Sequence, residues 1–171
     1  MLLSIPSLST RAAPMPILGI STNTRLLGLA IINQGILEDY SIHLHKSPWS
    51  ASKANKIITS LEPCARKYCI KNVVLSIPHV YHQTKAFKYL LLRIRRYFET
   101  KGIPVYHKSH EAIHTLCPSG QKKGKKAFMQ ALSIMYPQLS FCQVKEERNK
   151  SKYYIKIFEA VAAAILHDQE N

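Results

Sequence analysis

A run of lysines between residues 119 and 126 is the densest group of chemically active side chains in this sequence. The run reads Ser-Gly-Gln-Lys-Lys-Gly-Lys-Lys and contains Lys122, Lys123, Lys125 and Lys126. Four ammonium groups on a glycine-containing loop that leads into a helix can approach phosphates together with the amides at the start of that helix. The run therefore predicts binding to a polyanion, with a solvated loop of the same composition as the alternative.

The overall charge favours the same chemistry. The chain has 24 Lys and Arg residues against 10 Asp and Glu residues, which gives a formal net charge of +14. A surplus of this size in a small domain indicates a polyanionic partner, and nucleic acid is the commonest one. The remaining candidate contacts are arginines, namely Arg25, Arg93, Arg95 and Arg96. We expect all of these side chains to contact phosphates rather than base edges.

Several histidines have spacings that are seen among metal ligands. They are His79 and His82, and then His107, His110 and His114, with Cys117 as the nearest further ligand. Clusters of this looseness are weak evidence for zinc, and scattered surface or core histidines are the simpler explanation. We therefore predict no metal site among them, and we interpret the 4 cysteines as reduced thiols rather than as a disulfide framework.

Length and composition predict a single domain. With 171 residues, of which 46% are hydrophobic, the chain is long enough to bury a sizeable core. We expect residues 1–15 to be a flexible lead-in and residues 16–171 to form the domain. The start of the chain has no apolar run of the length that a signal peptide or a membrane span requires, so a cytoplasmic protein is expected.

The elements that position these residues begin with a hairpin. An apolar strand from residue 17 leads into the polar turn Ser21 to Arg25, and a nearly all-apolar strand follows over residues 26–32, as in strands that are covered on both faces. Gly19 and Gly28 lack side chains, which indicates that another backbone or a ligand comes close there. Asn-Gly-type turn residues at 33–35 then precede a third strand over residues 36–45.

The rest of the chain alternates helices and strands. Apolar spacing and breakers predict a helix over residues 51–69, kinked or divided at Pro63, a strand over 73–77, a helix over 84–101 and a strand over 104–107. A helical turn over 111–116 and helices over 125–136 and 151–168 follow, with 137–149 as a polar connection. This order predicts an α/β fold with a mixed five-stranded sheet, an antiparallel three-strand start, parallel crossovers and helices on both faces.

The two ends of this pattern resemble the RNase H-like superfamily, and in particular its RuvC branch of Holliday-junction resolvases. Residues 18–28 read Leu-Gly-Ile-Ser-Thr-Asn-Thr-Arg-Leu-Leu-Gly, where that branch opens Ile-Gly-Ile-Asp-Pro-Gly-Ser/Thr-x-x-x-Gly. Residues 152–167 resemble the ending Asp-x-x-Asp-Ala-Leu-Ala-x-Ala-x-x-His, and residues 124–132 resemble the helix that precedes it. The resemblance covers roughly residues 17–167 and implies the same fold.

The resemblance also implies where the chemistry would lie. RuvC-type nucleases cut phosphodiesters with two divalent ions such as Mg²⁺, which are held by acids on the first strand, the fourth strand and the last helix. By position these acids correspond to Ser21, Ser76, Lys156 and Glu159. Only Glu159 is a carboxylate, and Lys156 brings an ammonium to the place of the metal. We expect the four residues to share one cleft without catalysing cleavage, and Glu159 to form an i,i+3 ion pair with Lys156.

Three functional hypotheses follow from these residues. The first is a nuclease-inactive RuvC-like domain that needs no cofactor and binds nucleic acid through a basic surface, with structured or branched DNA favoured over RNA. The second is a pseudo-enzyme that acts as a protein-interaction subunit of a nucleic-acid machine, with a protein partner or as a homodimer. The third is an active Mg²⁺-dependent junction endonuclease with a rearranged site, for which Glu111 is the least securely excluded acid.

Overall fold

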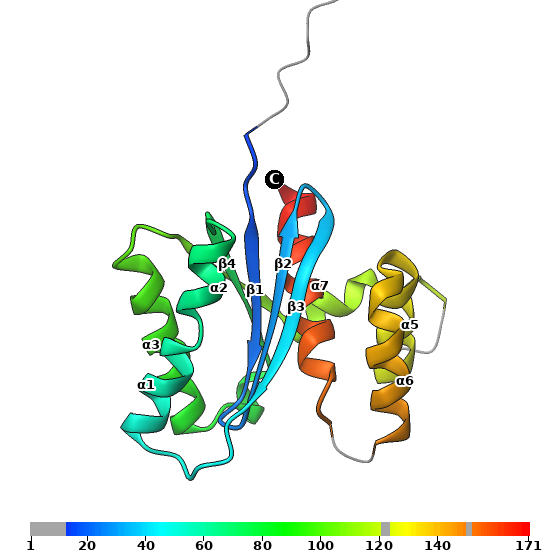
Figure 1. Cartoon of the computed structure of the whole chain (residues 1–171). Coiled ribbons are helices and arrows are strands. Elements are labelled where there is room, and N and C mark those ends of the chain that lie inside the picture. The colour runs from blue at the N-terminus through cyan, green and yellow to red at the C-terminus, as the bar shows by residue number, and fades with distance from the viewer. Residues whose placement is uncertain (1–12, 121–123, 150–151) are drawn as a thin grey trace, which may run out of the picture.

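A mixed sheet forms the centre of the molecule (Figure 1). The computed structural model describes residues 13–120, 124–149 and 152–171, so most of the predicted lead-in lies outside the described residues. The five strands lie in the order β3-β2-β1-β4-β5. They are β1 (Ile17–Thr22), β2 (Leu26–Asn33), β3 (Ile36–Leu44), β4 (Asn72–Ile77) and β5 (Val105–Ser109). β1 and β3 run antiparallel to β2, whereas β4 is parallel to β1 and β5, which confirms the predicted fold class.

Helices cover both faces of this sheet. On one face lie α1 (Ala51–Thr59), α2 (Glu62–Lys67) and α3 (Lys85–Glu99), and on the other lie α5 (Lys125–Met135), α6 (Ser140–Arg148) and α7 (Ile155–Glu170) (Figure 1). The short helix α4 (His110–Ile113) follows β5 directly. In the part of the chain that the structure describes, no helix combines the length and apolar character that crossing a membrane requires.

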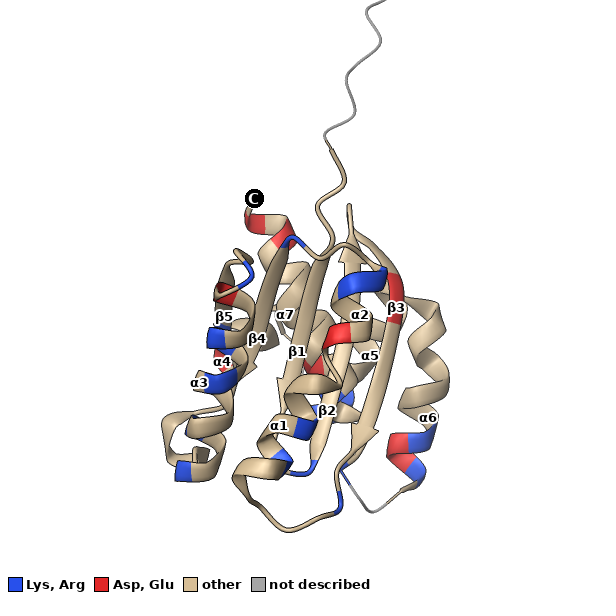
Figure 2. Cartoon of the chain, turned by 60° about the vertical axis from the view of Figure 1, so that its left-hand side comes forward, with Lys and Arg blue, Asp and Glu red and all other residues tan. Residues whose placement is uncertain are grey.

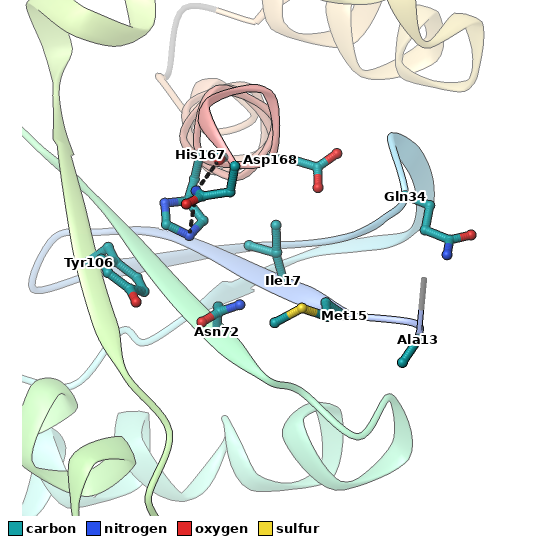
Figure 3. A pocket seen from close by; sticks show the side chains of 9 residues that line it. Ala13, Met15, Ile17, Gln34, Asn72, Tyr106, His167 and Asp168 are labelled. Atoms are coloured by element: carbon teal, nitrogen blue, oxygen red, sulfur yellow. Dashed lines mark hydrogen bonds between the residues drawn. The ribbon is translucent and has the colours of Figure 1, made fainter. Parts of the chain in front are cut away.

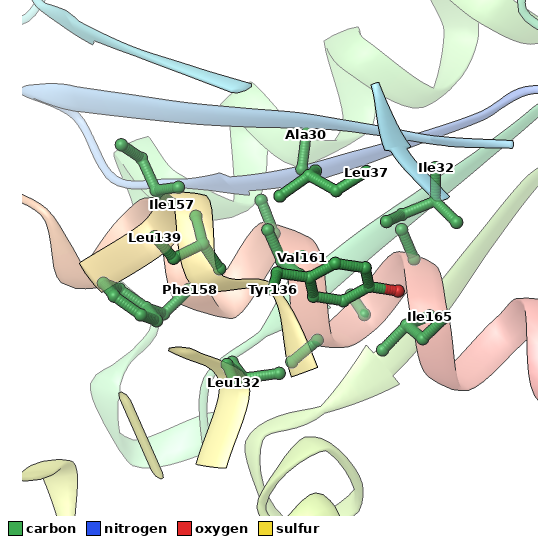
Figure 4. Close-up of a cluster of buried hydrophobic side chains, with 14 of the residues drawn as sticks. Ala30, Ile32, Leu37, Leu132, Tyr136, Leu139, Ile157, Phe158, Val161 and Ile165 are labelled. Atoms are coloured by element: carbon green, nitrogen blue, oxygen red, sulfur yellow. The ribbon is translucent and has the colours of Figure 1, made fainter. Parts of the chain in front are cut away.

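Each face of the sheet has its own hydrophobic core. The first core joins alternate residues of β1, β2 and β4 to α1 and α3, with Phe98 fully buried. The second joins the opposite residues of the strands to α5 and α7, and Figure 4 shows Val161 and Ile165 of α7 between the sheet and Leu132. Because α7 is covered by the sheet on one side and by α5 on the other, every residue from Ile157 to Ile165 is buried.

Two glycines allow α7 to lie directly against the sheet. A β-carbon on Gly19 would come within 2.0 Å of the carbonyl oxygen of Ala160, and one on Gly28 within 2.4 Å of that of Lys156. No side chain can be accommodated at such distances, so glycine is required at both positions. The prediction that another backbone comes close at these glycines is therefore confirmed.

The region between α5 and α7 differs from its prediction. Residues 137–149 were expected to form a polar connection, but they contain a short 3₁₀ turn and the nine-residue helix α6. Apolar and polar residues are spread around α6, which buries only Cys142 and Glu146, so its sequence lacks an apolar face.

The helix predicted over residues 51–69, kinked or divided at Pro63, is two helices, with Pro63 in the first turn of α2, where proline removes no helical hydrogen bond.

Candidate functional site

The two serines that replace family acids lie side by side at one end of the sheet. β1 and β4 are parallel neighbours, and Ser21 is paired in register with Ser76. Both side chains are buried. Because the carboxyl ends of parallel strands meet at one edge, the order of the elements alone brings these hydroxyls together, and ligand sites of α/β sheets form at such edges.

Glu159 completes this group from α7. Ser21 Oγ donates a hydrogen bond to Glu159 Oε2 at 2.5 Å, and Lys156 Nζ donates to the same oxygen at 2.9 Å. The structure therefore places Ser21, Lys156 and Glu159 in direct contact, with Ser76 beside Ser21 on the next strand, and the expected i,i+3 ion pair is present. The two serines were expected to share a cleft with Lys156 and Glu159, but they are buried and are not among the lining residues of the cleft beside Glu159. The Glu159 residue is 8% exposed, so its contacts are shielded from water.

His110 is a further member of this group, although no role was predicted for it from the sequence. Its Nε2 atom lies 3.7 Å from Glu159 Oε2 and is buried without a hydrogen-bond partner. Burial lowers the pKa of His110, and although the charge of Glu159 opposes this shift, the charge of Lys156 reinforces it. The only signal in the sequence was its place just after the last strand, at the same sheet edge as Ser21.

The start of α7 is held in place by Glu146 of α6. The fully buried carboxylate of Glu146 accepts hydrogen bonds from the backbone amides of Tyr153 at 3.1 Å and Tyr154 at 2.7 Å. It also pairs with Lys125 Nζ at 2.5 Å. A carboxylate at a helix N-terminus satisfies free amides and complements the helix dipole, so Glu146 fixes the turn from which Lys156 and Glu159 project. Glu146 lies in the segment 137–149 that was predicted to be a polar connection, so this role was not predicted.

These residues do not suit Mg²⁺. That ion prefers carboxylate oxygens in near-octahedral geometry, and within this group Glu159 is the one carboxylate, whose Oε2 is already bonded to Ser21 and Lys156. Glu111 lies at the same edge of the sheet but lines a separate hollow with His79 and His110. The ammonium group 2.9 Å from that oxygen would repel a divalent cation. Among the described residues, no three His, Cys, Asp or Glu side chains gather closely enough to hold a metal ion, including the histidines whose spacing suggested one.

A basic cleft opens beside Glu159. It has a volume of about 420 Å³ and is lined by Asn23, His114, Lys125, Lys152, Ile155, Lys156 and Glu159. We call it the lysine cleft. Three ammonium groups face one carboxylate within it, so its potential is positive and attracts anions. Lys152 is exposed at the rim.

The predicted lysine run is only partly placed. Lys122 and Lys123 lie outside the described residues. Lys126 is exposed in the first turn of α5, while Lys125 lines the lysine cleft but is engaged by Glu146. Lys125 is therefore a weaker candidate for phosphate contact than its place in the run suggested.

The predicted arginines do not share one surface. Arg25 is exposed on the turn between β1 and β2, near the lysine cleft, whose lining includes Asn23 of the same turn. Arg93, Arg95 and Arg96 belong to α3, which covers the opposite face of the sheet from α5 and α7 (Figure 1). Arg93 donates to Asn55 Oδ1 at 2.6 Å and Arg95 lies 3.6 Å from Glu99, so two of these three have partners within the fold.

Another hollow lies at the opposite end of the sheet (Figure 3). It has a volume of about 320 Å³, and Ile17, Met15, Tyr106 and His167 are among its lining residues. Among its lining residues, Asp168 is the one acidic side chain, and none is a lysine or an arginine. A hollow without Lys or Arg does not suit a phosphate.

Comparison with known proteins supports the fold. The sequence matches no family model and no curated protein. Among solved structures, it is similar to T. thermophilus RuvC in complex with a Holliday junction substrate, with a TM-score of 0.68 and 16% identity over 90% of this chain and 92% of that one. Fowlpox virus resolvase with its substrate Holliday junction DNA gives a TM-score of 0.53 and 13% identity over 91% and 98%. The predicted RuvC-like, RNase H-like fold is confirmed.

Proposed function

We propose that this RuvC-like fold serves as a nuclease-inactive domain that binds nucleic acid through the lysine cleft. The observation that carries the proposal is the surplus of positive charge at the sheet edge, where three lysines, Lys125, Lys152 and Lys156, line the lysine cleft together with one carboxylate, Glu159. Similar structures hold Holliday junction DNA, which supports structured or branched DNA as the ligand ahead of RNA.

The lack of nuclease activity follows from the charges of the site. A two-metal nuclease needs several carboxylates to hold the ions that activate water and stabilise the leaving oxygen. The hydroxyls of Ser21 and Ser76 add no negative charge, and Lys156 supplies a fixed positive charge at hydrogen-bonding distance from Glu159. Such a site favours a phosphate group over a metal ion, because ammonium groups, which attract anions, outnumber the carboxylates, which attract cations.

Binding of this kind has a measurable salt dependence. Each phosphate that is neutralised releases counterions, and the logarithm of the affinity falls by about 0.9 for each contact per tenfold increase in salt on duplex DNA. Contacts from Lys126, Lys152 and Arg25 would give a slope of roughly −3, because Lys156 is held by Glu159. The lysines at 122 and 123 would make this slope steeper.

The test is a titration of a four-way DNA junction, a DNA duplex and an RNA duplex at several salt concentrations. The double variant Lys126→Ala/Lys152→Ala should weaken binding and flatten the slope by roughly 2, because two phosphate contacts are lost. The matched control is Lys67→Ala/Lys71→Ala, which removes the same charge near the start of β4, at the other end of the sheet. Equal effects of the two double variants would contradict binding in the lysine cleft.

Cleavage is measured with the same substrates. We expect no product in the presence of Mg²⁺ or Mn²⁺. Cleavage by the pure protein that disappears in Glu159→Gln would instead support the third hypothesis, an active endonuclease with a rearranged site.

A protein partner or a second copy of the chain is the second candidate, and one observation favours it. Four apolar side chains are exposed on α5 and α6, namely Ile134, Met135, Phe141 and Val144. Exposed apolar side chains that lie together often mark protein contacts. Absence of DNA and RNA binding at low salt, together with self-association that Phe141→Ser abolishes, would favour this function over the first.

A further inference from the structure

A covered lysine without an acidic partner lies across the β1–β2 turn from the lysine cleft. Lys53, in the first turn of α1, is 3% exposed. Its Nζ atom donates to the backbone carbonyl of Ser47 at 2.5 Å, which uses one of its three protons. Lysine is rarely covered in this way unless it is paired. The loop that covers Lys53 lies at the surface, because its residues Ser47 and Pro48 are themselves exposed.

Two more basic groups adjoin this lysine. The backbone amide of His45 donates to the carbonyl of Arg25 at 2.7 Å, so these residues are neighbours at the ends of β3 and β2. Ser47, the partner of Lys53, follows His45 by two residues. His45 Nε2 is buried without a hydrogen-bond partner. Burial lowers the pKa of Lys53, and the charge of Arg25 lowers it further.

Among the residues that the structure describes, no carboxylate pairs with the cations of this group. In residues 13–120, 124–149 and 152–171, every ion pair with a carboxylate involves other cations, and neither Arg25 nor Lys53 takes part in one. Figure 2 shows blue segments where the β1–β2 turn, the end of β3 and α1 meet, and no red segment beside them. An uncompensated group of cations with an unused imidazole nitrogen is the arrangement expected of an anion site.

We propose that Arg25, His45 and Lys53 form a phosphate-binding site that adjoins the lysine cleft. Arg25 contacts the phosphate at the surface, His45 donates from Nε2, and Lys53 supplies its charge from beneath the loop. The turn that carries Arg25 is held by Asn23, whose Oδ1 accepts from the backbone amides of Arg25 at 2.8 Å and Leu26 at 2.7 Å.

The site extends the proposed function and rests on it where the phosphate belongs to a nucleic-acid strand. Asn23 lines the lysine cleft, and Arg25 follows it by two residues. One strand could therefore run from the lysine cleft over this turn to α1. A free phosphate ion offers the same chemistry, so both sources are tested.

The first measurement uses inorganic phosphate and the full chain. Titration with phosphate at constant ionic strength should shift the ring resonances of His45, assigned with His45→Gln, raise its pKa and increase the melting temperature. Lys53→Met should lose these responses, and it should be no less stable than the parent without phosphate, because an uncompensated charge has been removed. Lys56→Met is the matched control, since Lys56 is exposed on the same helix, and it should respond as the parent does.

The second measurement uses a DNA duplex. Loss of one phosphate contact in Arg25→Gln should flatten the salt slope by about 0.9, and Lys56→Met should leave it unchanged. Unchanged His45 resonances in phosphate and an unchanged slope in Arg25→Gln, with DNA still bound through the lysine cleft, would overturn this site alone. A phosphate response of His45 without any DNA binding would overturn the proposed function and leave the site as one for free phosphate.

Discussion

Replacing Glu159 by Gln should destabilise the protein and at the same time tighten its binding to DNA. In the parent, Glu159 Oε2 accepts hydrogen bonds from Ser21 Oγ at 2.5 Å and from Lys156 Nζ at 2.9 Å. Glutamine keeps the shape and an acceptor oxygen but removes the charge. Lys156, whose side chain is 13% exposed, would then lack a counter-ion in a position that water reaches poorly.

The expected loss of stability follows from the two hydrogen bonds. A bond to a charged group contributes about 1.5–3 kcal/mol and a neutral one about 0.5–1.5 kcal/mol, so the bond from Ser21 loses about 1 kcal/mol when the charge is removed. The bond from Lys156 keeps its charged donor but loses the ion pair, which at this shielded position costs about 1 kcal/mol more. The sum is about 2 kcal/mol. For a chain of this size the melting temperature should fall by about 4–8 °C. Thermal and urea denaturation at low salt measure this change.

The expected gain in binding has an electrostatic origin. Removing one negative charge at ~6 Å from a phosphate in water is worth about 0.7 kcal/mol, which is roughly a threefold increase in affinity. Lys156 would also be released toward the ligand, so the salt slope should steepen by about 0.9. Fluorescence anisotropy with labelled duplex at several salt concentrations measures both quantities.

The control for both measurements is Glu147→Gln. Glu147 is exposed on α6, accepts a hydrogen bond from Gln143 and is not among the residues that line the lysine cleft, so the variant makes the same change in net charge outside the cleft lining. We expect a change in stability of less than about 0.5 kcal/mol. Weaker DNA binding in Glu159→Gln than in the control, or an unchanged melting temperature, would refute the arrangement of charges proposed for the site.

Three further predictions concern the fold and its titrating groups. Gly19→Ala should lower the free energy of unfolding in urea by about 3 kcal/mol or more, because its β-carbon would lie 2.0 Å from the carbonyl oxygen of Ala160. The control is Gly124→Ala, whose β-carbon would have no atom within 4 Å, and it should lower the free energy of unfolding by less than about 1 kcal/mol. The free energy of unfolding should fall from pH 7 to pH 5, because burial lowers the pKa of three histidines and the unfolded chain therefore binds more protons than the folded one. Calorimetry at both pH values measures the change, and a protein that becomes more stable on acidification would contradict the prediction. The three are His45, His110 and His167. Burial raises the pKa of Cys64 to about 11, so a thiol reagent at pH 8 should modify the exposed Cys69 first, and mass spectrometry of the digested protein identifies the modified residue.

Residues at fixed places in strong elements were predictable from sequence. Ser21 and Ser76 end apolar strands, and Glu159 lies on a helix with an apolar pattern, so topology alone was enough to bring them together. The two glycines that admit α7 were also recognised, because a side chain is absent from strands that otherwise carry large ones. In each case the local pattern and the tertiary contact agree.

Features that depend on contacts distant in sequence were not predictable in this way. Helix α6 has no apolar face, and its Glu146 is stabilised by amides of α7 that no local pattern reveals. His110 belongs to the site because β5 ends beside β4, and its spacing from the other histidines gave no indication of the contact with Glu159. The arginines of α3 were grouped with the lysines on charge alone, but the crossover places α3 on the other face of the sheet.

The triple role of Glu146 links the occupancy of the lysine cleft to the local unfolding of α7. Its carboxylate is shared between the ammonium of Lys125 and the amides of Tyr153 and Tyr154. A phosphate that draws Lys125 away changes the electrostatic environment of that carboxylate, and so changes the free energy of opening the first turn of α7. By thermodynamic reciprocity, any change that frays this turn must alter the affinity of the cleft by the same factor. Hydrogen exchange at the start of α7 would therefore report ligand binding at a residue on a different helix.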